Sequence, residues 1–133
     1  MIVVDTDVLA YLLLPGPRTE QAEVLRRHHR QWAVPPLWRS EFRNVLTGYL
    51  RRDRLPFPTA VALMQEAEAI LSAHEEKIST EHVLQLVSSS RCSAYDCEFV
   101  AVAQHLSVSL ITEDRVILTA FPDVAQSLHQ ATS

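Results

Sequence analysis

The chain has 133 residues, of which 47% are hydrophobic, and it contains only two glycines. This length and composition predict a single folded domain over residues 1–133 and exclude a linker or a disordered tail. The net charge of −4 argues against a general nucleic-acid-coating protein, because such proteins neutralise phosphates with Lys and Arg.

The N-terminal segment predicts a strand followed at once by helices. Residues 2–4 are a short, apolar, β-branched run that ends at Asp5, a pattern typical of a buried parallel strand. Apolar residues at helical spacing follow over residues 8–13. Residues 20–30 then predict a polar surface helix that carries a basic run, and residues 32–34 predict a second strand.

The middle of the chain predicts a helical hairpin. Residues 37–52 carry apolar side chains three and four positions apart, and residues 59–73 repeat that spacing after two prolines. We expect the two helices to pack against each other. Lys77 and Ile78 predict a weak third strand, and residues 83–87 predict a further helix.

The C-terminal part repeats the opening pattern. A helix is predicted over residues 94–105, and residues 108–112 form a second clear buried strand that ends on Glu113 and Asp114. Strands that alternate with helices predict an α/β fold, a three-layer α/β/α sandwich with a central, mainly parallel sheet. Ligands bind such sheets beyond the carboxyl ends of the strands, so Asp5 and Asp114 should meet if their strands are neighbours.

Glu41 stands out because of its place on the predicted helix of residues 37–52. At about 100° per residue, Glu41 shares the side of Trp38 and Val45, and Arg39 and Arg43 lie roughly opposite. A carboxylate that faces a core is unfavourable unless it is paired or binds a metal, which favours a functional role.

Four segments of the sequence together resemble the PIN-domain nucleases, and especially the small toxins of the VapC type. The resemblance spans the chain from end to end. The segments are Val3-Val4-Asp5-Thr6-Asp7-Val8-Leu9, Ser40-Glu41-Phe42-Arg43-Asn44-Val45-Leu46, Ser93-Ala94-Tyr95-Asp96-Cys97-Glu98-Phe99-Val100-Ala101 and Leu110-Ile111-Thr112-Glu113-Asp114.

The resemblance implies a PIN-like fold and a divalent-metal-dependent endoribonuclease, the toxin of a type II toxin-antitoxin pair. It also implies an RNA substrate, an antitoxin protein as inhibitor and a homodimer. The catalytic and metal-binding acids carried over by motif are Asp5, Glu41, Asp96 and Asp114. Thr6, Asn44 and Thr112 are the expected supporting residues, Asn44 as a group that orients Glu41. The family more often shows Asn or Ser at the position of Asp7, whose role is therefore open.

The expected chemistry agrees with these residue types. Mg²⁺ and Mn²⁺ prefer carboxylate oxygens and water, and a site without a nearby His or Cys points away from zinc. A bound ion can lower the pKa of water for attack on the scissile phosphate, so we expect products with 5′-phosphate and 3′-hydroxyl ends.

Each acid also has a purely structural interpretation. Asp5 and Asp114 can cap the helices that follow them, and Asp96 lies in a first helical turn after Ser93, where the helix dipole favours negative charge. Further acids are interpreted as solvated side chains, although Glu98 or Glu113 could stand near a metal; they are Glu81, Glu98 and Glu113.

Two other functions stay open at this point. Asp5-Thr6-Asp7 after a strand also resembles haloacid-dehalogenase-like phosphohydrolases, in which Asp5 would be the nucleophile, Asp7 the general acid, and Lys77 would hold the phosphate. That hypothesis leaves Glu41 and Asp96 unused. The third hypothesis is a non-catalytic, PIN-like interaction module.

The expected location is the cytoplasm, without a membrane. The apolar run at residues 8–14 is far too short to span a bilayer, and no basic leader precedes it. Cys92 and Cys97 lack the partners of a disulfide framework or a zinc site, which favours reduced thiols.

Overall fold

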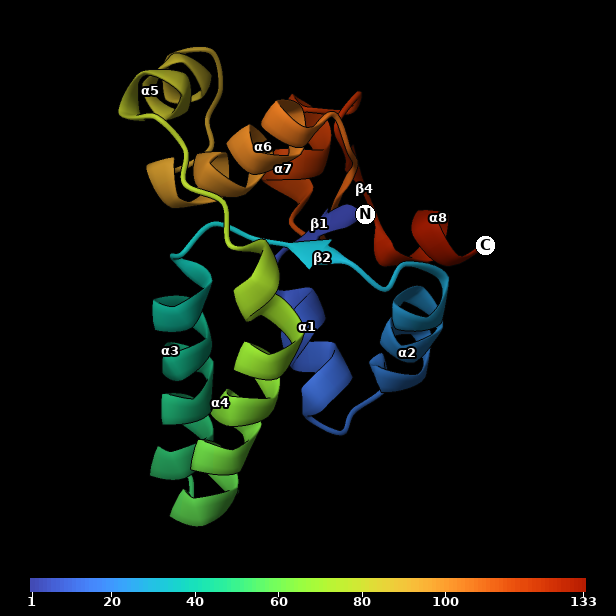
Figure 1. Ribbon diagram of the computed structural model, residues 1–133, viewed down its shortest axis with the longest axis vertical. Helices are drawn as coiled ribbons and strands as arrows, with labels where there is room; N and C mark the ends of the chain where they lie inside the picture. Colours follow the sequence, from blue (N-terminus) through green and yellow to red (C-terminus); the bar gives the residue numbers. More distant parts are fainter.

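The computed structural model describes residues 1–133 as a parallel sheet between two groups of helices (Figure 1). The sheet has four strands, in the order β2-β1-β3-β4, and all three neighbouring pairs are parallel. The strands are β1 (Ile2–Val4), β2 (Trp32–Ala33), β3 (Leu110–Ile111) and β4 (Ala125–Gln126). Because β1 pairs with β3, the acids that follow these two strands are brought to the same edge of the sheet.

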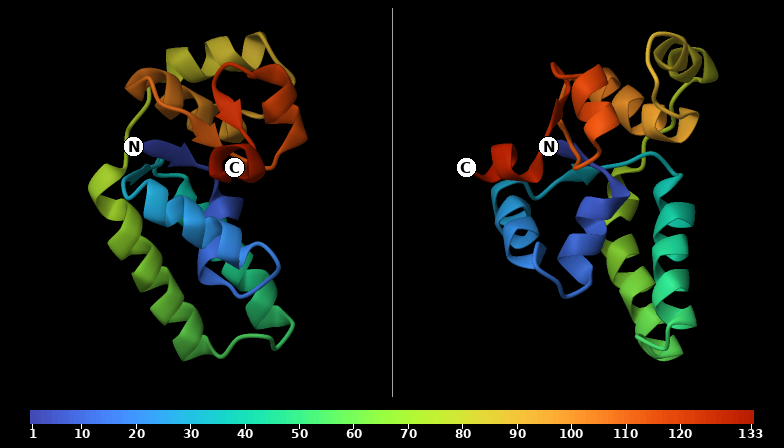
Figure 2. Two further views of the ribbon diagram at one scale, coloured as in Figure 1. Left: turned by 90° about the vertical axis from the view of Figure 1, so that its right-hand side faces the viewer. Right: turned by 180° about the vertical axis from the view of Figure 1, so that it is seen from behind.

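The helices form layers on the two faces of the sheet, which confirms the predicted three-layer α/β/α fold. Below the sheet in Figure 1 lie α1 (Thr6–Leu13), α2 (Thr19–His28), α3 (Trp38–Arg51) and α4 (Phe57–Leu71). Above it lie α5 (Thr80–Ser88), α6 (Ala94–Leu106) and α7 (Arg115–Ala120). Both further views keep this separation (Figure 2). The predicted hairpin is present, since α3 and α4 pack side by side.

The core is formed by aromatic and branched side chains from both layers. Trp32, Trp38, Phe42 and Phe99 are all buried, so both tryptophans belong to the core. Cys92 and Cys97 are buried free thiols. None of the helices combines the length and the apolar character that crossing a membrane needs.

The predicted strand at Lys77 and Ile78 is wrong. The chain instead makes a single parallel bridge between Val34 and Glu75, after the short 3₁₀ helix η1 (Ser72–His74). The pairing falls earlier because the Glu75 side chain accepts a 2.9 Å hydrogen bond from Nε1 of Trp38, which fixes Glu75 rather than Lys77 beside β2.

Two C-terminal elements have no counterpart among the predicted ones, namely β4 and α8 (Leu128–Thr132). Strand β4 has only two residues, too few to show a period. Helix α8 did have a local signal, because Ser127 and Gln130 form a capping box in which each side chain accepts a hydrogen bond from the other residue's backbone N–H.

Candidate active site

An acidic pocket of about 250 Å³ opens beyond the carboxyl ends of β1 and β3. Its carboxylates come from the end of β1, the first turn of α1, helix α3, the first turn of α6 and the start of α7. The residues that line it are Asp5, Thr6, Asp7, Glu41, Asn44, Val45, Asp96 and Asp114. The four predicted acids and Asn44 are therefore brought together from segments that lie far apart in the sequence.

Asp5 is held by two hydrogen bonds at the end of β1. Its Oδ1 accepts from the backbone N–H of Thr6 at 2.7 Å, and its Oδ2 accepts from the Thr112 hydroxyl at 2.8 Å. Burial nevertheless raises the pKa of Asp5 to about 6; the Thr112 hydrogen bond opposes the shift, and the charges of Asp7 and Glu41 add to it. Asp5 thus caps α1 and also faces the pocket, so its structural and site roles coexist.

Thr6 fixes the orientation of Glu41. The buried Thr6 hydroxyl donates a 2.7 Å hydrogen bond to Oε1 of Glu41, which joins the first turn of α1 to α3. Glu41 makes no hydrogen bond with Asn44, so the orienting group is the threonine. Burial raises the pKa of Glu41, the Thr6 hydrogen bond lowers it, and the charge of Asp96 raises it further.

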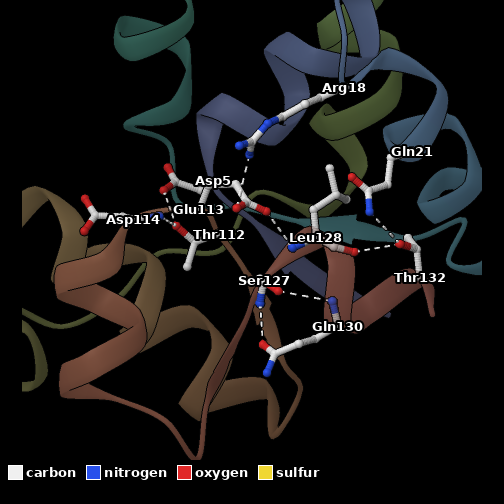
Figure 3. A network of polar contacts seen from close by, with 10 residues as sticks. All are labelled: Asp5, Arg18, Gln21, Thr112, Glu113, Asp114, Ser127, Leu128, Gln130 and Thr132. Carbon is white, nitrogen blue, oxygen red and sulfur yellow. Dashed lines mark hydrogen bonds and ion pairs between the residues drawn. The ribbon is translucent and has the colours of Figure 1, made fainter.

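Thr112 connects two of the acids. Its side chain is fully buried, and its hydroxyl donates to Asp5 and accepts from the backbone N–H of Asp114 at 3.0 Å (Figure 3). Asp114 in turn accepts from the backbone N–H groups of Val116 and Ile117 through Oδ1, which makes it the N-cap of α7. The cap holds one oxygen, Oδ1, and no hydrogen bond engages Oδ2.

Asp96 and Asp7 complete the pocket from the first turns of two helices. The Ser93 hydroxyl accepts from the backbone N–H of Asp96 at 3.1 Å and caps α6. Desolvation and then the charge of Asp114 raise the pKa of Asp96, and the same two causes raise the pKa of Asp7. The sequence does not decide the role of Asp7; its place in the first turn of α1 puts it on the pocket side.

No cation of the protein neutralises these acids. The ion pairs of the chain join Arg18 to Glu113 and Arg39 to Glu68 and Glu75, all outside the pocket. Burial is the main cause of the raised pKa values of Asp5, Glu41 and Asp96, and repulsion between these crowded carboxylates without a counter-charge raises them further. The carboxylate oxygens of the pocket are hard donors and their negative charge is not compensated, so the pocket suits a hard divalent cation.

Side chains do not converge on one point in this arrangement, since no three Asp, Glu, His or Cys residues are close enough together to enclose an ion directly. That spacing fits Mg²⁺, which binds through one or two carboxylates and keeps several of its waters.

The other acids considered from the sequence lie outside the pocket. Glu113 turns away from it, accepts a 2.7 Å hydrogen bond from the backbone N–H of Leu128 and pairs with Arg18 at 3.1 Å (Figure 3). Glu98 does not line the pocket, although its charge contributes to the raised pKa of Glu41. Lys77, which a phosphohydrolase would need beside Asp5, is exposed and also outside the pocket.

Comparisons with known proteins agree with this architecture. The family model described as "PIN domain" matches residues 2–124. A relative named "Ribonuclease VapC3", from Pyrobaculum aerophilum, is 27% identical over 124 residues, which are 91% of this chain and 95% of the relative.

Solved structures share the fold at lower identity. The crystal structure of PAE2754 from Pyrobaculum aerophilum has a TM-score of 0.75 at 20% identity, with 98% of this chain and 92% of that chain covered. A toxin-antitoxin complex from Klebsiella pneumoniae gives 0.68 at 18% identity over 96% and 98% of the two chains. FitAcB from Neisseria gonorrhoeae gives 0.72 at 19% identity over 94% and 95%.

Proposed function

The chain belongs to the PIN-domain family, and from that membership we propose that it is a divalent-metal-dependent endoribonuclease, with residues 1–133 forming one nuclease domain. The observation that carries the proposal is the pocket in which Asp5, Glu41, Asp96 and Asp114 stand together without a protein cation. The relative named as a ribonuclease supports RNA as the substrate.

The same four acids are the proposed ligands of Mg²⁺ or Mn²⁺, in part through water molecules. A divalent ion bound there would lower the pKa of water to supply a nucleophile, and it would neutralise charge that develops on the phosphate. The protein contributes orientation. Thr6 holds Glu41, and Thr112 holds Asp5 and the backbone N–H of Asp114, so these carboxylates keep their positions around the acidic pocket.

Asp7 is the acid whose role differs in kind. It lines the pocket from α1, and no side-chain hydrogen bond holds it. We assign Asp7 to the outer part of the site, where its negative charge helps to attract a cation. Replacing its carboxylate by the amide of asparagine would then remove no metal ligand.

The biological role we propose is that of the toxin in a toxin-antitoxin pair. Support comes from the fold shared with a chain of the Klebsiella pneumoniae toxin-antitoxin complex and from the relative called Ribonuclease VapC3. A cognate antitoxin protein would then be the partner, and a homodimer the working form. Co-expression with the product of the adjoining gene, followed by purification of a stable complex, tests the partner.

The activity is tested by incubating the purified protein with a mixed RNA pool in Mn²⁺, in Mg²⁺ and in EDTA. Cleavage should need the metal and should leave 5′-phosphate ends. Glu41→Gln and Asp96→Asn should lower the rate by at least about a hundredfold, because changes in outer-shell groups alone lower activity by ~10–100-fold. Glu81→Gln, an exposed acid on α5, is the matched control and should cut normally. Equal rates in all four proteins would contradict the proposal.

A further inference from the structure

A second pocket, of about 390 Å³, adjoins the acidic pocket on the side of α1. The two pockets share Asp7 and Val45 as lining residues, so they lie next to each other. The second pocket is formed by α1, by the loop between α1 and α2, and by α3, which lies beside α1. We call it the tyrosine pocket, because Tyr11 of α1 and Tyr49 of α3 both line it.

The lining of the tyrosine pocket differs from that of the acidic pocket. Leu14, Val45 and the two tyrosine rings give it a largely apolar wall, and Arg18 supplies one cation. Its size lies within the range of about 300–1,000 Å³ that is usual for pockets that hold small organic groups. Aromatic side chains beside apolar ones are the chemistry that accepts a nucleobase, since every base has a π-face that stacks.

Arg18 is held in place at the rim of this pocket. Its guanidinium pairs with Glu113 at 3.1 Å and lies over the Tyr11 ring, 5.2 Å from the ring centroid. Glu113 is itself anchored by the backbone N–H of Leu128, so the loop that carries Arg18 is tied to the C-terminal helix (Figure 3). A guanidinium fixed by one carboxylate keeps further N–H donors free for a phosphate.

The cation stands out because the neighbouring acidic pocket has none. A nucleic acid bound across the two pockets would meet negative charge where a metal is expected and positive charge in the adjoining pocket. Arg52 adds a second cation on this side, 5.5 Å from the ring centroid of Tyr49.

We propose that the tyrosine pocket is a nucleobase subsite, which receives the base of the nucleotide next to the scissile phosphate between Tyr11 and Tyr49, with Arg18 contacting that nucleotide's phosphate. The inference rests on the proposed function, because the acidic pocket places the scissile phosphate. It makes Tyr11 and Tyr49 determinants of which base is bound, and Arg18 a contact that does not depend on the base.

The experiment measures how tightly the protein binds fluorescein-labelled RNA octamers. Three of them consist of A, of C or of U alone, and the fourth has abasic positions. The protein carries Asp96→Asn to prevent cleavage. Tyr49→Leu and Tyr11→Leu remove the aromatic ring and keep apolar bulk, and Tyr49→Phe keeps the ring. Phe57→Leu is the matched control, since Phe57 is an exposed aromatic residue at the start of α4. Thermal unfolding confirms that each variant is folded.

Tyr49→Leu and Tyr11→Leu should each weaken the binding of at least one octamer by about fivefold or more, the usual size of one stacked base. Tyr49→Phe and Phe57→Leu should bind as the starting protein does, and the abasic octamer should be insensitive to all four changes. Arg18→Gln should weaken every octamer, the abasic one included, because a phosphate contact does not depend on the base.

The subsite would be refuted if both leucine variants bound all octamers within twofold of the starting protein, or if the abasic octamer lost as much affinity as the others. The RNA-pool assay with an intact Asp96 separates the two proposals. If the tyrosine variants cut the pool as well as the unchanged protein does, the ribonuclease proposal is supported and the subsite is refuted. If the pool stays uncut while octamer binding still depends on Tyr49, the base-binding subsite is supported and the ribonuclease proposal is refuted.

Discussion

The hydroxyl of Thr112 donates a 2.8 Å hydrogen bond to Oδ2 of Asp5, a residue 107 positions away in the sequence. The two residues end neighbouring strands, and the same hydroxyl accepts from the backbone N–H of Asp114. One buried threonine thus sets the relative position of two acids, and its loss should affect both the fold and the site.

Thr112→Val should destabilise the protein by roughly 1–3 kcal/mol, because the nearly isosteric valine leaves a buried acceptor and a backbone donor without partners. Urea unfolding in EDTA measures this free energy. The control is Thr119→Val, which changes an exposed threonine on α7 and should have little effect. An unchanged unfolding free energy in Thr112→Val would mean that the hydrogen bond is dispensable.

Thr6→Val should weaken metal binding, because Glu41 loses the donor that orients it. We expect a loss in Mn²⁺ affinity of ~10-fold or more, the usual effect of removing an outer-shell hydrogen bond. Thr6→Ser keeps the hydroxyl and should restore the affinity. Isothermal titration with Mn²⁺ distinguishes the two variants, and equal affinities would rule out an orienting role for this hydroxyl.

Asp7→Asn should stabilise the metal-free protein at pH 7. The pKa of Asp7 is raised in the folded state by desolvation and by Asp114. A carboxyl whose folded pKa lies above its unfolded value binds protons better in the folded state, so its contribution to stability falls as the pH rises between the two values. The asparagine variant has no carboxyl group to ionise here, so it does not lose this stability as the pH rises. Its advantage in melting temperature should be largest at pH 7 and should shrink toward pH 4, whereas Asp123→Asn, an exposed control, should show no such trend.

The stabilisation by metal should grow with pH. Asp5 has a pKa of about 6 in the metal-free protein and must release its proton to bind a cation. The rise in melting temperature on addition of Mg²⁺ should therefore be small at pH 5 and near its full size at pH 7.5. A rise that is as large at pH 5 as at pH 7.5 would exclude Asp5 as a ligand with this pKa.

Glu113→Ala should loosen α8, since Leu128 loses the acceptor for its backbone N–H. Glu113→Gln keeps an acceptor and removes only the ion pair with Arg18, which is half exposed and worth about 0–1 kcal/mol. Hydrogen exchange of the Leu128 amide should speed up strongly in the alanine variant and only slightly in the glutamine variant. Equal exchange in both would assign the docking of α8 to other contacts.

The sequence by itself determined the elements that carry the acids. The apolar runs before Asp5 and Asp114 are buried in neighbouring parallel strands, and the helical period placed Glu41 on the inner side of α3. Such features are local, because burial of a strand or of one helix face leaves a direct trace in the order of apolar and polar residues.

Long-range contacts select which of two adjacent acids enters the pocket. Asp114 faces it because it caps α7, and Glu113 turns to Arg18 and to the backbone of Leu128, a residue on α8, which has no counterpart among the predicted helices. They also decide that Asp7 joins the pocket and that Thr6, rather than Asn44, holds Glu41. These outcomes depend on side-chain partners that lie far apart in the chain, and periodicity along one element contains no information about which element will cover it.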